Sequence, residues 1–197
     1  MKILPLARAL LAAAAAHACV CAHGHIMVAV FNYAGAPRSV VAPAVEAARM
    51  AFLNAGIETE WAVCDSEECT PALSVDGPYL ELLVMPRLRG SMPGHPAGYA
   101  MTGGPYLRPR AYAFYDAVKS AADREVRPMS LVLGCVLVHE TAHLLGLQHQ
   151  SHGVMRANLN GGDMDNLAVG RAFSAEEGKQ LRAAVDPSRT LRAAVGP

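Results

Sequence analysis

The sequence lacks an excess of charge of either sign. Its 17 lysines and arginines balance 17 aspartates and glutamates, so the formal net charge is zero. It also lacks a basic block of the kind that neutralises the phosphates of a nucleic acid. We therefore expect no nucleic acid partner.

Long apolar runs are missing as well. A helix that spans a bilayer needs about 20 consecutive apolar residues, and no stretch of this chain reaches that length. Nevertheless, 52% of the 197 residues are hydrophobic, which is enough to bury a substantial core. The sequence shows no internal repeat. We expect one domain over residues 23–186 and a C-terminal tail over residues 187–197.

The first 22 residues differ from that domain. The basic residues Lys2 and Arg8 are followed by a run rich in alanine and leucine, and small residues follow this run. This order is typical of a secretory signal peptide, with candidate cleavage sites after Ala18 and Ala22. Cleavage would make the protein secreted or periplasmic. The alternative is an unprocessed N-terminal tail.

Cysteines are few. Once residues 1–22 are removed, only Cys64, Cys69 and Cys135 remain. Cys64 and Cys69 flank a polar segment of four residues, and an oxidising compartment would let them form a short disulfide. Two free thiols are the alternative. Because Cys135 lies in an apolar run, we expect it to be a buried core thiol.

Hydrophobic patterns predict an alternation of strands and helices. The segment 39–55 is expected to be a helix, because its apolar residues fall on one face and Gly56 follows its end. The glycines and prolines of residues 86–96 predict a loop. Short apolar or alternating segments predict strands at residues 25–33, 57–63, 79–85, 98–103 and 110–118.

A second helix is predicted over residues 129–145. This segment is apolar on nearly every side, which is typical of a helix buried within its domain. It nevertheless contains His139, Glu140 and His143, whose burial is costly unless they have partners. His139 and His143 are four residues apart, so their rings project from one face. This spacing lets two imidazoles share one zinc ion, with Glu140 beside it.

The pattern continues past this helix in the sequence "HETAHLLGLQH" (139–149). Gly146 can adopt a left-handed conformation that ends the helix and turns the chain. His149 can then return as a third ligand. Three neutral imidazoles leave one tetrahedral position for water, which is the arrangement of a catalytic zinc. We therefore predict Zn²⁺ as the cofactor and no site for an organic cofactor.

This segment, together with "HGVM" (152–155), resembles the metzincin clan of zinc metallopeptidases. The stretch "SHGVMRANL" (151–159) is also similar to a group of small exported bacterial proteins assigned as metallopeptidases. The resemblance implies an α+β fold. Its elements are a twisted, mostly parallel sheet with an antiparallel edge strand, a backing helix, an active-site helix, a methionine turn and a C-terminal helix. It also implies that Met155 forms this turn beneath the histidines.

Two departures leave the subfamily open. Astacin-like and serralysin-like members carry a tyrosine two residues after the methionine, and matrixin-like members carry a proline. Here that position is Ala157. We therefore assign no tyrosine role and infer no substrate from a subfamily.

The resemblance implies peptide-bond hydrolysis. With a zinc-activated water at the site, Glu140 is expected to act as the general base. A peptide or protein substrate would pair along an edge strand, for which the segment 98–103 is our candidate. Two alternatives stay open: a zinc-binding scaffold module that no longer hydrolyses, and an exopeptidase on the same scaffold. We favour a monomer.

Three further segments complete the prediction. We expect His152 to be a surface histidine. The segment "NGGDMDN" (160–166) has carboxylates that could hold calcium, but it lacks the spacing of an EF-hand, so we expect a solvated loop. The segment 173–185 is expected to be the closing helix, with a capping box formed by Ser174 and Glu177.

Export leads to a direct prediction about the mature protein. Mass spectrometry of the chain recovered from outside the cytoplasm should show the loss of roughly the first 18 to 22 residues, because signal peptidase cuts after small residues. An intact Met1 terminus on such material would contradict the export prediction.

Overall fold

The computed structural model describes residues 25–65, 78–88, 96–102 and 108–186. The predicted signal peptide, Cys69 and the predicted C-terminal tail lie outside these ranges. Among the described residues, no helix combines the length and the apolar character that crossing a membrane requires.

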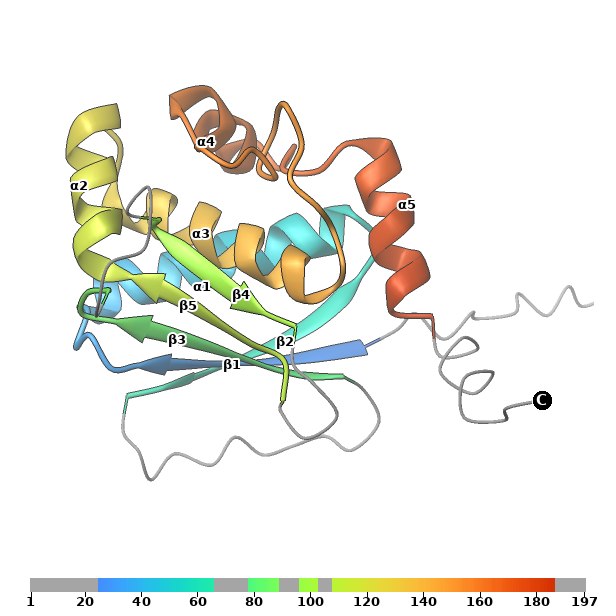
Figure 1. Ribbon diagram of the computed structural model, residues 1–197, viewed down its shortest axis with the longest axis horizontal. Helices are drawn as coiled ribbons and strands as arrows, with labels where there is room; N and C mark the ends of the chain where they lie inside the picture. Colours follow the sequence, from blue (N-terminus) through green and yellow to red (C-terminus); the bar gives the residue numbers. More distant parts are fainter. Residues whose placement is uncertain (1–24, 66–77, 89–95, 103–107, 187–197) are drawn as a thin grey trace, which may run out of the picture.

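A five-stranded sheet with the order β2-β1-β3-β5-β4 forms the centre of the fold (Figure 1). The pairings β1–β2, β1–β3 and β3–β5 are parallel, whereas β4 pairs antiparallel with β5. The predicted mostly parallel sheet is therefore confirmed, and β4 is its antiparallel edge strand. The strands are β1 (His25–Asn32), β2 (Glu58–Cys64), β3 (Tyr79–Met85), β4 (Gly98–Met101) and β5 (Arg110–Phe114).

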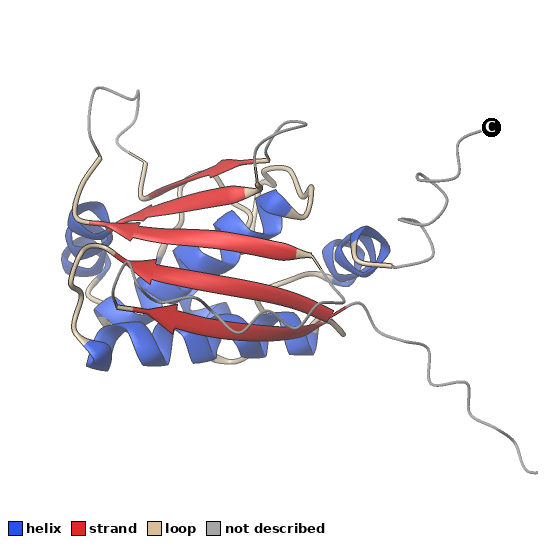
Figure 2. Cartoon of the chain, turned by 90° about the horizontal axis from the view of Figure 1, so that it is seen from below, coloured by secondary structure: helices blue, strands red, loops and turns tan. Residues whose placement is uncertain are grey.

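Helices cover one face of this sheet, as Figure 2 shows with the strands in front and the helices behind them. Alternate strand residues point toward the helices. Val28 of β1 and Leu82 of β3 are fully buried on that side. The helices are α1 (Arg38–Asn54), α2 (Tyr115–Glu125), α3 (Met129–Leu144), α4 (Gly161–Ala168) and α5 (Ala175–Ala184).

Small residues bring α1 close to α3. Ala44 and Ala48 are fully buried on the inner face of α1. A Cβ atom added at Gly134 of α3 would lie 3.2 Å from the carbonyl oxygen of Ala44 and 3.4 Å from the Cβ of Ala47. Because Gly134 has no side chain, the backbones of α1 and α3 can approach each other closely at this point. This contact sets the position of α3, the helix that carries the histidines.

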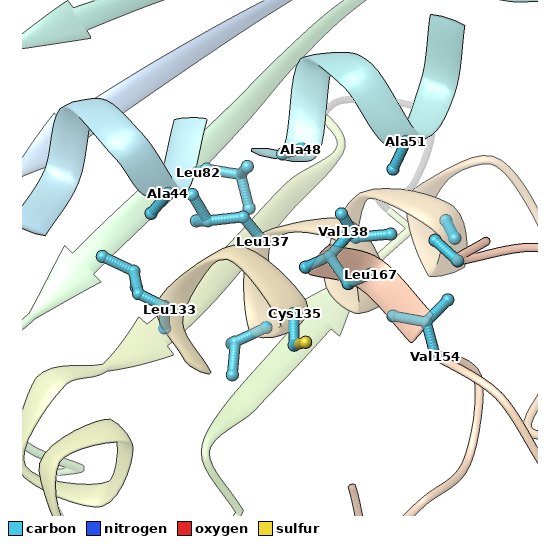
Figure 3. Close-up of a cluster of buried hydrophobic side chains, with 14 of the residues drawn as sticks. Ala44, Ala48, Ala51, Leu82, Leu133, Cys135, Leu137, Val138, Val154 and Leu167 are labelled. Carbon is cyan, nitrogen blue, oxygen red and sulfur yellow. The ribbon is translucent and has the colours of Figure 1, made fainter. Parts of the chain in front are cut away.

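Apolar side chains fill the layer between the helices and the sheet. Figure 3 shows Leu82 of β3, Leu137 of α3 and Ala48 of α1 in this cluster. Cys135 belongs to the same core and is fully buried, which confirms the prediction of a core thiol. Burial raises the pKa of this thiol to about 12, so it stays protonated at neutral pH. Cys64, at the end of β2, is buried and disulfide-bonded.

The predicted strand 110–118 is wrong beyond Phe114. Strand β5 ends there, and α2 begins at Tyr115. The buried residues Val118, Ala121 and Ala122 recur with the spacing of one helix face. The sequence did not indicate this change from strand to helix, because the alternation of small and aromatic residues in "AYAFY" is typical of a strand.

The predicted solvated loop 160–166 is also wrong, because most of it belongs to α4. The side chain of Asn160 accepts a hydrogen bond from the backbone of Asp163, at 3.1 Å, and the Asp163 carboxylate accepts one from the backbone of Asn160, at 3.2 Å. This capping box and the buried side chains of Met164 and Leu167 stabilise the helix. The sequence did not predict this helix, because two glycines lie at its start and glycine disfavours helices.

The closing helix confirms its predicted cap. Ser174 accepts a hydrogen bond from the backbone of Glu177 at 3.3 Å, and Glu177 accepts one from the backbone of Ser174 at 2.7 Å. Phe173, just before the cap, packs on Phe52 of α1 with ring centroids 5.4 Å apart. Helix α5 is thereby anchored to the core.

The close approach of α1 and α3 can be tested by Gly134→Leu. The added side chain has no space against Ala44 and Ala47, so we expect the free energy of unfolding to fall by roughly 1–3 kcal/mol. Denaturant unfolding measures this change. The control Ala168→Leu adds a similar side chain at an exposed position of α4. Equal stability of the two variants would contradict the packing described here.

Candidate metal centre

The last two turns of α3 carry three of the predicted site residues. His139 is 7% exposed and Glu140 is 4% exposed, while His143 is half-buried. The preceding residues from Val132 to Val138 are all buried. Polar groups in such a helix need partners, and the chain that follows the helix provides them.

A turn at Gly146 ends this helix. The N–H of Leu147 donates to the carbonyl of Ala142 at 3.0 Å, and the N–H of Gly146 donates to the carbonyl of His143 at 2.9 Å. These two bonds form a Schellman motif, which places Gly146 in the left-handed region with φ of 93°. The prediction of a left-handed glycine at this point is confirmed.

The following loop folds back beneath the histidines. The N–H of Gln150 donates to the carbonyl of Met155 at 2.8 Å, and the N–H of Arg156 donates to the carbonyl of Gly153 at 3.0 Å. Met155 is fully buried in this turn. The loop thereby brings the carbonyl of Val154 within 2.7 Å of the His139 ring.

The structure brings the three predicted ligands together. The Nε2 atom of His139 lies 2.9 Å from Nε2 of His143 and 3.3 Å from Nε2 of His149. His149, although exposed, is therefore part of the cluster. Within the described ranges, no second group of three or more His, Cys, Asp or Glu side chains gathers its ligand atoms this closely.

Backbone carbonyls fix the tautomers of two of these rings. Nδ1 of His139 lies 2.7 Å from the Val154 carbonyl, and Nδ1 of His143 lies 2.7 Å from the Leu147 carbonyl. Because a carbonyl only accepts hydrogen bonds, each Nδ1 must carry the hydrogen, which leaves a lone pair on each Nε2. Two lone pairs 2.9 Å apart repel each other unless a cation lies between them. A zinc ion fits this set of nitrogen donors.

Burial favours the neutral form that a metal requires. Desolvation lowers the pKa of His139 to about 4, and the hydrogen bond to Val154 offsets only part of this effect. Desolvation also lowers the pKa of His143. At neutral pH a shared proton is therefore disfavoured, and a metal cation suits the rings better than protonation.

Glu140 lies beside the cluster and has a different environment. Its carboxyl group faces the same cavity and packs against Gly98 of β4. Burial raises the pKa of this carboxyl to about 8. A cation held by the histidines would lower it again, because a nearby positive charge favours the carboxylate.

An open cavity of about 860 Å³ connects these groups to solvent. The three histidines and Glu140 form one wall, and β4 forms another. The remaining walls come from α2 and from residues 157–160. The segment 98–103 was our candidate edge, and its residues Gly98–Met101 are indeed the edge strand of the sheet.

Several parts of this site could not be predicted from the sequence. The carbonyls of Leu147 and Val154 are backbone groups, so no pattern of side chains indicates their role. The ion pair between the buried Asp163 of α4 and the half-buried Arg156, at 3.0 Å, holds α4 to the turn that contains Met155. The sequence did not indicate this pair because it did not indicate helix α4. His152 is exposed, as predicted, and does not line the cavity.

Comparison with protein-family models and with curated proteins finds no match. Several solved structures are similar, and two of them illustrate the likeness. A zinc-dependent peptidase from Methanocorpusculum labreanum superimposes with a TM-score of 0.51 at 15% identity, over 78% of this chain and 99% of its own. Archaemetzincin from Methanopyrus kandleri gives 0.53 at 15% identity, over 84% and 98%. The chain therefore shares the fold of these two proteins, and its three histidines fit zinc binding.

The ligand set can be tested with His149→Ala. The wild-type protein should bind one zinc ion per chain, and the loss of one of three imidazoles should weaken binding by more than about 100-fold. Competition with a chromophoric chelator measures the affinity. The control His152→Ala removes an exposed histidine outside the cavity and should bind zinc like the wild type. Unchanged affinity of His149→Ala would remove His149 from the site.

Proposed function

We propose that this protein is a zinc metalloendopeptidase of the metzincin clan, with Glu140 as the general base. The observation that carries the proposal is the placement of Glu140. Its buried carboxyl group adjoins three converging imidazoles on the wall of an open cavity. Two peptidases with the same fold support the proposal.

The three histidines would hold the metal. When bound, zinc supplies a Lewis acid that lowers the pKa of water and polarises the scissile carbonyl. The hydrogen bonds from His139 to Val154 and from His143 to Leu147 keep both rings aimed at one point before any metal arrives. Preorganised ligands of this kind do not have to reorient during the reaction.

Glu140 would move the proton. It does not need to bind the metal, because three imidazoles already provide the usual number of protein ligands for a catalytic zinc. Its carboxylate would accept a proton from the attacking water and then pass it to the leaving amine. Its low exposure limits competing hydrogen bonds from bulk water.

Among the described residues, no strand pairs with the outer edge of β4, and this edge suits an extended peptide. Gly98 pairs with Ala113 in the antiparallel register, and the N–H of Phe114 donates to the carbonyl of Ala97 at 2.8 Å. Hydrogen-bonding direction alternates along such a strand. The backbone groups of Gly98 and Ala100 therefore point away from β5. A substrate strand can pair with them next to the histidines, which supports a peptide or protein substrate.

We also propose that the protein acts outside the cytoplasm. The signal-like start of the sequence supports this location. The disulfide of Cys64 supports it as well, because disulfides persist mainly in oxidising compartments.

The mechanism can be tested with Glu140→Gln, which preserves size but removes the base. We expect the variant to bind zinc and to unfold like the wild type, while kcat for a peptide substrate falls by about 10²–10⁴-fold. The control Glu58→Gln makes the same chemical change at an exposed position of β2 and should leave kcat unchanged. If wild type and Glu140→Gln cut equally well, Glu140 is not the base.

Two choices of substrate separate the alternatives. Peptides blocked at both termini are cut by an endopeptidase but not by an exopeptidase. A zinc-loaded wild-type protein that cuts no member of a peptide library would instead favour the scaffold alternative.

A further inference from the structure

Glu140 lies directly against Gly98 of the edge strand. A Cβ atom added at Gly98 would lie 2.7 Å from Cγ and 2.8 Å from Cδ of Glu140. Carbon atoms in contact are normally about 3.5–4.0 Å apart, so even a methyl group does not fit there. Glu140 thus occupies the space that a side chain at position 98 would fill.

The backbone at position 98 does not itself require glycine. The described glycines with positive φ are at other positions of the chain. An alanine could therefore adopt the same strand conformation. The side chain of Glu140 excludes an alanine at position 98, so the contact with Glu140 explains why this position is a glycine.

Neither partner can withdraw without changing the site. Glu140 belongs to a helix whose neighbouring residues Thr141 and Ala142 are fully buried. Strand β4 is held by its pairing with β5 and by the Ala97–Phe114 hydrogen bond. Added volume at position 98 must rotate the Glu140 side chain or push β4 outward. Either movement changes the distance between the carboxylate and the free edge of the strand.

We infer that Gly98 is a positioning residue, whose missing side chain sets where the Glu140 carboxylate lies relative to the peptide-pairing edge of β4. The inference rests on the proposed function, because it assigns Gly98 a part in the same reaction. Gly98 then contributes to the placement of both the substrate and the base. Its backbone groups would pair with a substrate strand at the outer edge of β4, and its lack of a side chain leaves space for the carboxylate of Glu140.

The first test is Gly98→Ala. Displacement of a catalytic group by about 1 Å can cost up to roughly 100-fold in rate, so we expect kcat to fall by about 10- to 100-fold. We expect KM to change by less than about 3-fold, because the backbone of β4 can still pair with a peptide. The control Gly161→Ala places a Cβ at 3.5 Å from its nearest neighbours, which is ordinary contact, and should leave kcat unchanged.

A second variant distinguishes positioning from general damage. Glu140→Ala removes Cγ and Cδ, so a methyl group at position 98 then meets neither atom. In this background Gly98→Ala should change the free energy of unfolding by less than it does when Glu140 is present, because the close contact is gone. Equal changes in both backgrounds would overturn the inference, and so would a wild-type kcat for Gly98→Ala.

A structural measurement keeps this inference separate from the proposed function. If the wild type cuts no peptide, the peptidase proposal fails, and crystal structures of zinc-loaded wild type and Gly98→Ala still test the contact. We expect the Glu140 carboxylate to shift relative to β4 in the variant. Superimposable positions of Glu140 and β4 in the two structures would overturn the inference even for an active enzyme.

Discussion

Two hydrogen bonds from histidine rings to backbone carbonyls are the constraint on which the site depends. Val154 accepts from His139 and Leu147 accepts from His143, each at 2.7 Å. The left-handed turn at Gly146 delivers one carbonyl, and the loop closed by Gln150 and Met155 delivers the other. Together they leave the two Nε2 lone pairs facing one point. The metal site is thus a consequence of how the chain leaves α3.

The rest of the fold keeps that helix still. Ala44 and Gly134 let α1 and α3 touch, while the sheet and the core hold α3 on its other sides. His139, Glu140 and His143 lie in the last two turns of α3, which line an open cavity together with β4 and α2. The stability of the core therefore offsets the cost of burying His139 and Glu140, and the cavity gives these residues access to solvent.

Local patterns in the sequence predicted the parts of the site that are themselves local. The spacing of His139, His143 and His149 and the glycine between them identified the ligand cluster. Hydrophobic patterns identified the strands, and the resemblance to the metzincin clan implied the mostly parallel sheet. Backbone acceptors such as Val154 leave no mark in a side-chain pattern. The contact of Gly98 with Glu140 joins two segments far apart in the chain, so only the three-dimensional structure reveals it. Helix α4 was missed because its first turn is rich in glycine.

Three preorganised imidazoles should hold one zinc ion and leave one position for water. Zinc K-edge X-ray absorption on the zinc-loaded protein tests this arrangement most directly. We expect three imidazole nitrogens at about 2.0–2.1 Å from the zinc ion and one further light-atom ligand at a similar distance. A sulfur ligand at about 2.3 Å, or scattering from fewer than three imidazoles, would contradict it.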